Sequence, residues 1–219
     1  HDCTEAWLQA VGLAANVPQA QIDAAKNKWL PAIRGALART PIKGRVTVSG
    51  YEGSELLVAR LLIESGADVP YVGTACPKTP WSAPDLEWLQ ARGVHVQYRA
   101  SLEQDIAAVR EFRPDLAIGT TPVVQAAKQA SIPSLYFTNL ISARPLFGPM
   151  GAGSLAQVIN AAIGNKARFE KMREFFGDVG GGDQAGVWEG KPVMRPEFKA
   201  ETKRQVIKMM KKRKAEEMI

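Results

Sequence analysis

The sequence predicts an α/β protein of the Rossmann-like, three-layer type, built on a five-stranded parallel sheet. Two observations support this fold class. From residue 45 onward, short segments rich in β-branched and aromatic residues alternate strictly with helical patterns, in which apolar residues recur every three or four positions. The links between these segments are short, as expected for strands joined by crossover helices. Such an alternation produces a parallel sheet with helices on both faces.

Two helices are expected before the alternating region, and they form a helical lead-in over residues 1–44. The first begins near Asp2, which together with Glu5 has the spacing of a capping box. The second begins after Pro18, and Pro31 should bend it. Its apolar stripe consists of Ile22, Ala25, Trp29, Ile33, Ala36 and Leu37.

Five short strands and their helices are expected next. Ser54 is placed to cap the helix after the first strand, which should end at Gly66, and Ser101 with Gln104 should cap the helix after the third strand. The predicted strands are residues 45–49, 68–72, 94–98, 115–119 and 133–138, and the predicted helices between them are residues 54–66, 85–92, 102–112 and 122–130.

A helical C-terminal extension is expected over residues 166–219, after an α/β domain of residues 45–165. Helical patterns occupy residues 155–164 and 166–176. The glycine-rich residues 177–190 form either a flexible linker or a clamp over a neighbour. Most of the net charge of +6 lies in residues 199–219, so the basic character belongs to a tail and not to a nucleic-acid-binding face. This tail is either a solvated helix or a docking element for an acidic partner.

The segment after the fifth predicted strand, residues 139–153, is expected to be a long loop. Right-handed crossovers place all post-strand loops at one edge of the sheet, where open α/β folds bind ligands. This loop is unusually apolar, and an apolar loop is normally covered by a ligand or a partner chain. Alternatively, it packs on its own domain. Arg144, the one charge within it, is suited to clamp a carboxylate or to form a salt bridge within the protein.

The residues supply little chemistry of their own. The loop SGYEGS after the first strand lacks both glycine-rich phosphate motifs, and the second strand does not end in an acid that would hold a ribose. No G-x-S-x-G elbow is present, and two histidines give a Ser-His-acid triad poor support. His1, His95, Cys3 and Cys76 lack metal-ligand spacing, so no metal site is predicted. Cys76 is interpreted as a packing residue.

Two cysteines are too few for a disulfide framework and fit a reducing, cytoplasmic compartment. No apolar run approaches the roughly 18 residues of a membrane-spanning helix. The chain begins with His1 rather than methionine, which leads us to expect a protein that continues beyond this sequence.

Several segments resemble the third domain of nitrogenase-like reductases, in particular the branch that reduces chlorophyllide a. They include VGTACPKTPWSAPDLEWL, PSLYFTNLISARPLFGPMGAGSLA, FFGDVGGGDQAGVWEG and the terminal AEEMI. The opening HDCTEAWLQAVG resembles the helix that enters the last domain of such subunits. The resemblance covers essentially the whole chain, and implies that it is the C-terminal portion of a longer oxidoreductase subunit with a preceding domain.

The resemblance also implies a reaction and its partners. The expected reaction is ATP-dependent reduction of the C7=C8 double bond of chlorophyllide a in bacteriochlorophyll biosynthesis. A homologous subunit Z would complete a heterotetramer with a [4Fe-4S] cluster at the interface, and an ATP-hydrolysing iron–sulfur subunit X would supply electrons. The cluster ligands would lie outside these 219 residues, so the fragment alone would be inactive.

By the same resemblance, the loops after the first and fifth strands would form part of the substrate pocket, on adjacent strands. A cofactor-ligating histidine of the relatives would fall near Thr138, where this sequence has none, which fits a flat tetrapyrrole. No catalytic residue is assigned. A non-catalytic scaffold for cofactor assembly and a stand-alone small-molecule binding module remain alternatives. The expected substrate-binding residues are Ser49, Gly50, Tyr51, Asn139, Leu140, Ile141, Arg144, Leu146 and Phe147.

Overall fold

The computed structural model describes residues 2–142 and 148–176. These residues belong to two units, His1–Lys166 and the part that begins at Ala167, and each unit is described by itself. Of the second unit, only helix α9 (Lys166–Phe176) is described, at the position where the sequence predicts it. The predicted glycine-rich segment and basic tail lie outside the described residues. No helix within the described residues is long and apolar enough to cross a membrane.

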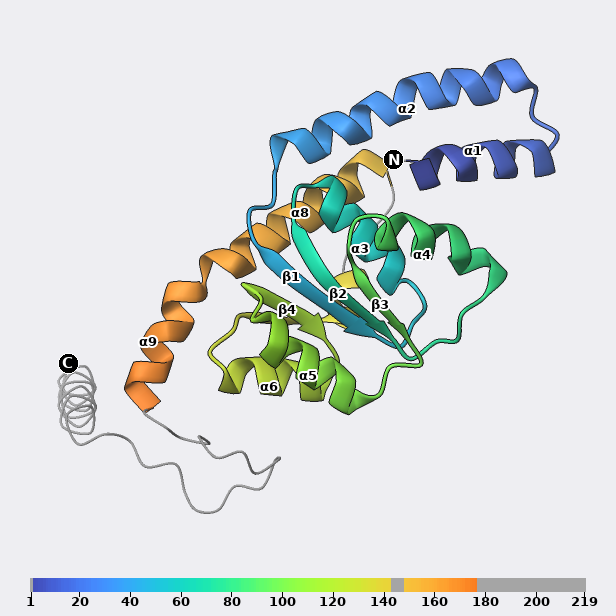
Figure 1. The fold of residues 1–219 in the computed structure, drawn as a ribbon. Helices are drawn as coiled ribbons and strands as arrows, with labels where there is room; N and C mark the ends of the chain where they lie inside the picture. The colour runs from blue at the N-terminus through green and yellow to red at the C-terminus, as the bar shows by residue number, and fades with distance from the viewer. Residues whose placement is uncertain (1, 143–147, 177–219) are drawn as a thin grey trace, which may run out of the picture. The chain divides into compact units, whose positions relative to one another are not determined.

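The sheet has five parallel strands in the order β3-β2-β1-β4-β5. Figure 1 labels β1 to β4. All five predicted strands are confirmed, and their ends lie within two residues of the predicted ones. Apolar, β-branched residues dominate the central strands because both faces of the sheet are covered. The strands are β1 (Arg45–Gly50), β2 (Asp68–Thr74), β3 (His95–Tyr98), β4 (Leu116–Gly119) and β5 (Ser134–Tyr136).

The predicted helices are also present. The capping box at Ser101 is confirmed: Ser101 Oγ accepts from Gln104 N at 3.3 Å, and Gln104 Oε1 accepts from Ser101 N at 2.8 Å. Pro31 lies inside a helix that continues on both sides of it. The helices of the first unit are α1 (Asp2–Ala14), α2 (Gln19–Arg39), α3 (Glu55–Glu64), the short 3₁₀ helix η1 (Pro80–Ser82), α4 (Ala83–Gln90), α5 (Leu102–Phe112), α6 (Thr121–Gln129), α7 (Phe137–Ser142) and α8 (Gly148–Gly164).

The predicted long loop over residues 139–153 is wrong for the residues that the structure describes. Helix α7 begins directly after β5, and α8 begins at Gly148, well before the predicted start at residue 155. Glycines favour a loop locally, but two of those in α8 are packing residues: Gly151 is buried, and a Cβ on Gly153 would lie 3.8 Å from Ala36 Cβ on α2. Small residues let α8 and α2 approach closely, which offsets the low helix propensity of glycine.

The sheet has a hydrophobic core on each face, because successive residues of a strand point to opposite faces. Val48 and Ile118 pack with residues of α3, α4, α7 and α8, whereas Ala117 packs with Val109 on α5 and Val123 on α6. Figure 1 shows α5 and α6 on the face opposite α3 and α8. The three-layer α/β prediction is therefore confirmed.

Candidate functional site at the carboxyl edge of the sheet

The sheet reverses its winding beside β1, and this position defines the candidate site. The chain moves outward from β1 to β2 and β3, then returns to β4 on the other side of β1. Ligands of open α/β sheets bind where the strand order reverses in this way, beyond the carboxyl ends of the strands. The expectation that the first and fifth strands are adjacent is wrong, because β4 lies between β1 and β5.

The segments after β1 and β5 nevertheless meet. Thr138 Oγ1 donates to Glu52 Oε1 at 2.7 Å, and the Tyr51 hydroxyl lies 3.5 Å from Thr138 Oγ1. Because the Thr138 proton points to Glu52, the Tyr51 hydroxyl is the donor in the second contact. Tyr51 is 59% exposed. This chain of hydrogen bonds joins the β1–α3 loop to α7 and holds one large aromatic side chain at the surface between them.

A buried carboxylate fixes the shape of the β1–α3 loop. Glu55 is fully buried, and it accepts from Glu52 N at 2.7 Å, Gly53 N at 2.9 Å and Thr74 Oγ1 at 3.0 Å. Gly50 is required beside it, because a Cβ at that position would collide with the Glu55 carboxylate. Three donors satisfy the carboxylate and hold two consecutive loop amides in place.

Ser54 differs in part from its predicted role. It occupies the N-cap position of α3, but its side chain makes no capping hydrogen bond. Glu55, the next residue, bonds backwards to the loop amides instead. The helix still ends as predicted, because Gly66 adopts a φ of +97°, a left-handed conformation that glycine tolerates best.

The loop after β2 completes the edge. Ala75 N donates to Gly50 O at 2.9 Å, and Cys76 Sγ donates to Tyr51 O at 3.6 Å. Thr74 Oγ1 also accepts from Cys76 N at 3.2 Å. Cys76 thus lies beside the backbone of Tyr51, an exposed candidate residue. Its interpretation as a packing residue stays a prediction.

The expected substrate-binding residues divide into three groups. Tyr51 and Asn139 are exposed at the edge. The others in the described part are wholly or partly buried: Ser49 is 3% exposed and donates to Ile118 O at 3.4 Å, Gly50 is buried in β1, Leu140 is 5% exposed within the core, and Ile141 packs against that core. The third group, Arg144, Leu146 and Phe147, lies outside the described residues.

Sequence reasoning missed the residues that organise the edge, namely Glu52, Glu55 and Thr138. Glu55 looks like an ordinary acidic residue in the first turn of a helix, and such residues are usually solvated. Its role depends on the shape of the loop, which turns the amides of Glu52 and Gly53 towards the carboxylate, and on Thr74, which lies 19 positions away in the chain.

A second buried carboxyl lies under the opposite face of β2. Asp105 on α5 is 6% exposed and accepts from the Tyr71 hydroxyl at 2.8 Å. Burial raises the pKa of Asp105 to about 6. The hydrogen bond from Tyr71 opposes this shift, and the negative charge of Glu55 adds to it. Burial and the neighbouring Asp105 also raise the pKa of Tyr71. The Tyr71 ring stacks on His95 at a centroid distance of 5.7 Å. Tyr71 and Asp105 are 4% and 6% exposed, so the pair is internal to the domain.

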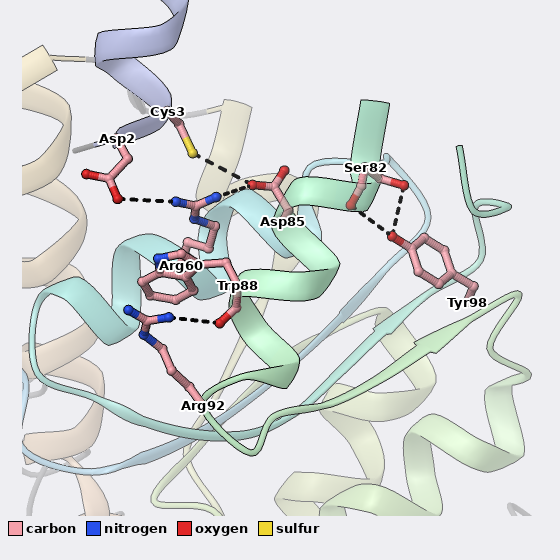
Figure 2. Close-up of polar contacts among 8 residues, drawn as sticks. All are labelled: Asp2, Cys3, Arg60, Ser82, Asp85, Trp88, Arg92 and Tyr98. Atoms are coloured by element: carbon pink, nitrogen blue, oxygen red, sulfur yellow. Dashed lines mark hydrogen bonds and ion pairs between the residues drawn. The ribbon is translucent and has the colours of Figure 1, made fainter. Parts of the chain in front are cut away.

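The cysteines do not form a metal-binding group. Cys3 Sγ donates to Asp85 Oδ1 at 3.7 Å (Figure 2), and burial raises the pKa of the Cys3 thiol. A raised pKa disfavours the thiolate that ligates metals. Cys76 is engaged with Tyr51 instead. Within residues 2–142 and 148–176, no group of three or more His, Cys, Asp or Glu side chains is arranged to hold a metal ion. The side chains in this part of the chain therefore do not fit an iron–sulfur cluster.

Comparison with known proteins now defines the family. A model for nitrogenase component 1 type oxidoreductases matches residues 1–163. The chain belongs to this family. The resemblance to nitrogenase-like reductases is thereby confirmed, and the matched region includes every strand of the sheet and nearly all of α8.

Two curated relatives match the whole chain. It is 66% identical over 219 residues to the chlorophyllide reductase 52.5 kDa chain of Cereibacter sphaeroides, and 64% identical over 219 residues to the protein of the same name from Rhodobacter capsulatus. In each case the match covers 100% of this chain and 44% of the relative. The chain therefore spans less than half the length of these relatives.

Solved structures support the fold. Two structures of nitrogenase Cp1, at pH 6.5 and pH 5, match with TM-scores of 0.56 and 0.51 and sequence identities of 21% and 10%. They cover 76% and 70% of this chain, and the matched parts are 38% and 37% of the nitrogenase chains. At these identities the similarity establishes the shared fold alone.

Proposed function

We propose that the chain is a portion of a chlorophyllide reductase subunit, which reduces the C7=C8 double bond of chlorophyllide a in bacteriochlorophyll biosynthesis. The observation that carries this proposal is the identity of 66% and 64% with chlorophyllide reductase chains along all 219 residues. Because the chain spans 44% of each relative, the activity would belong to the assembled, longer protein.

The contribution proposed for this portion is one wall of the tetrapyrrole site. A chlorin requires apolar walls with a few polar groups that fix its orientation. Residues 139–147 offer Leu146 and Phe147 as apolar contacts and Arg144 as a donor to the propionate. Tyr51 and Asn139 are the exposed candidates in the described part. The contact between Thr138 and Glu52 supports a shared site, because it joins the two segments.

The electron-transfer chemistry is assigned to other parts of the complex. A [4Fe-4S] cluster would supply electrons to the substrate, and its ligands would come from outside this chain. The homologous subunit Z would share the cluster, and the ATP-hydrolysing subunit X would deliver electrons, in the cytoplasm. The residues of this chain would bind and orient chlorophyllide a and exclude water from it.

One alternative is disfavoured by the surface of the domain. A stand-alone, monomeric binding module should leave little apolar surface exposed, yet Trp7 is 59% exposed, and Trp29 and Leu57 are each 44% exposed. These side chains favour a domain that is covered within a larger assembly. A non-catalytic scaffold would also have apolar side chains covered within an assembly, so the exposed surface does not distinguish it from the reductase. The two differ in turnover, because a scaffold would bind the substrate without converting it.

The test is a turnover assay on the assembled protein. The full-length protein, purified with its associated chains, would receive chlorophyllide a, ATP and a reductant under anaerobic conditions. We expect an ATP-dependent absorbance change that marks conversion of the chlorin to a bacteriochlorin. Chlorophyllide binding without conversion would assign the chain to a scaffold, and absence of binding would refute the proposal.

A further inference from the structure

An apolar groove of about 690 Å³ lies among α1, α2, α3 and α8, and Ser54, Gly148 and Pro149 line it where it borders the two candidate segments. It is lined mainly by aromatic and aliphatic side chains, and the described residues 148, 149 and 152 at the start of α8 close one side. Its principal apolar residues are Trp7, Leu8, Trp29, Ile33, Leu57 and Leu61.

Polar contacts of Arg60 and Asp85 hold α1 in the position in which it forms one wall of the groove. Arg60 on α3 is 6% exposed, and its Nη1 lies 2.7 Å from Asp85 Oδ1 on α4 and its Nη2 lies 4.0 Å from Asp2 Oδ2 on α1. Cys3 donates to the same Asp85 carboxylate, as Figure 2 shows. The Trp88 ring lies 4.6 Å from the Arg60 guanidinium carbon. The first turn of α1 is thus anchored to α3 and α4, and the aromatic side chains farther along α1 and α2 line the groove.

The groove offers apolar contacts rather than free charge. Arg60 is paired with Asp85, and Glu64 also interacts within the protein. The exposed apolar surface continues beyond the groove along α1, where Val11, one turn after Trp7, is 45% exposed. Two exposed tryptophans with aliphatic neighbours have the composition of the centre of a protein–protein interface, where aromatic residues act as anchors. A small ligand inside the groove would leave Val11 uncovered.

We propose that this groove is the docking surface for an apolar segment of the longer polypeptide to which the chain belongs. The relatives have more than half of their length outside the matched region, since the chain covers 44% of each. All walls of the groove lie within residues 1–163, the part that the family model matches. Interfaces between domains of one chain cover about 600–1,500 Å² of surface, and the exposed apolar side chains around this groove are suited to one of them. This inference does not depend on the identity of the substrate.

The test places a photo-crosslinker in the groove of the full-length protein. Benzoylphenylalanine would replace Leu57 in one variant and Leu102 in the control. Both leucines lie in the first turn of a helix, and they are 44% and 40% exposed. Leu102 begins α5, which covers the opposite face of the sheet. After irradiation, mass spectrometry would identify the residues that each position reaches.

We expect crosslinks from position 57 to residues of the same polypeptide outside this 219-residue portion, and none to those residues from position 102. A second pair of variants, Leu57→Glu and Leu102→Glu, should differ in the same way. A charge at position 57 would weaken the docking, so proteolysis between this 219-residue portion and the rest of the polypeptide should accelerate for Leu57→Glu and not for Leu102→Glu. Crosslinks from position 57 to a second copy, to a different subunit or to no polypeptide would overturn the proposal. Loss of chlorophyllide binding alone, with the crosslink retained, would refute the proposed function and leave the docking surface intact.

Discussion

The buried Glu55 gives the most specific prediction about the candidate site. Its two carboxylate oxygens face the amides of Glu52 and Gly53, at 2.7 and 2.9 Å. Glu55→Gln keeps the volume of the side chain but places an NH₂ group against one of these donors. One partly buried amide would then lose its acceptor, which we expect to lower the free energy of unfolding by about 1–3 kcal/mol. Thr74→Val removes one of the three donors with little change in shape and should cost about 1–2 kcal/mol.

Urea unfolding followed by circular dichroism would measure these differences, and hydrogen exchange would report on the loop directly. In Glu55→Gln, the amides of Glu52 and Gly53 should exchange faster, whereas amides in α5, on the opposite face, should not change. The reasoning would be refuted by a Glu55→Gln protein that unfolds at the wild-type urea concentration and keeps protected loop amides. In that case, the Glu55 carboxylate would not determine the conformation of the β1–α3 loop.

Three further predictions concern the titration of Asp105, the thiol of Cys76 and the binding of an iron–sulfur cluster. The pKa of Asp105 is raised from 3.8 to about 6, so the folded state binds this proton more tightly than the unfolded state. As the pH rises from 4 to 7, the free energy of unfolding of wild type should fall by on the order of 2 kcal/mol relative to that of Asp105→Asn. Unfolding free energies of the two proteins that change with pH in parallel would contradict this. Cys76→Ala should keep most reductase activity in the assembled protein, and a loss beyond roughly a hundredfold, about 2.7 kcal/mol, with the complex intact would make the thiol a participant. The isolated chain should bind no iron–sulfur cluster on anaerobic reconstitution, because Cys3 and Cys76 cannot supply the usual four ligands, whereas a stoichiometric visible chromophore would contradict this.

The regular parts of the fold follow from local patterns, which explains why they could be predicted. The Ser101–Gln104 capping box depends on residues three apart, and the strands depend on short runs of apolar residues. The start of α8 could not be predicted in this way. Gly148, Gly151 and Gly153 favour a loop locally, whereas in the folded domain Gly151 is buried and Gly153 lies close to Ala36 on α2.

The candidate site was less predictable because its contacts are non-local. The order of strands separates β1 from β5, yet Thr138 reaches Glu52 across 86 positions of the chain. Leu140 was expected in a pocket as one apolar residue among several, and the helical period of α7 turns it into the core. Spacing in a sequence identifies which loops share an edge, but the side chains that face outward depend on the structure of each loop.

The central claim is that residues 139–147 form a wall of the tetrapyrrole site, and chlorophyllide affinity tests it most directly. The assembled protein would be titrated with chlorophyllide a, and binding would be followed by the pigment absorbance in wild type, Phe147→Ala, Arg144→Ala, Arg144→Lys and, as a surface control on α5, Glu111→Ala. We expect Phe147→Ala to weaken binding by roughly 1–3 kcal/mol, the scale of one buried side chain. Arg144→Ala should weaken it too, with partial rescue by lysine because the bidentate fork is lost, and Glu111→Ala should bind as wild type. Wild-type affinity in both loop variants, together with failed association with the partner subunit, would show that the segment is an interface and not a pocket.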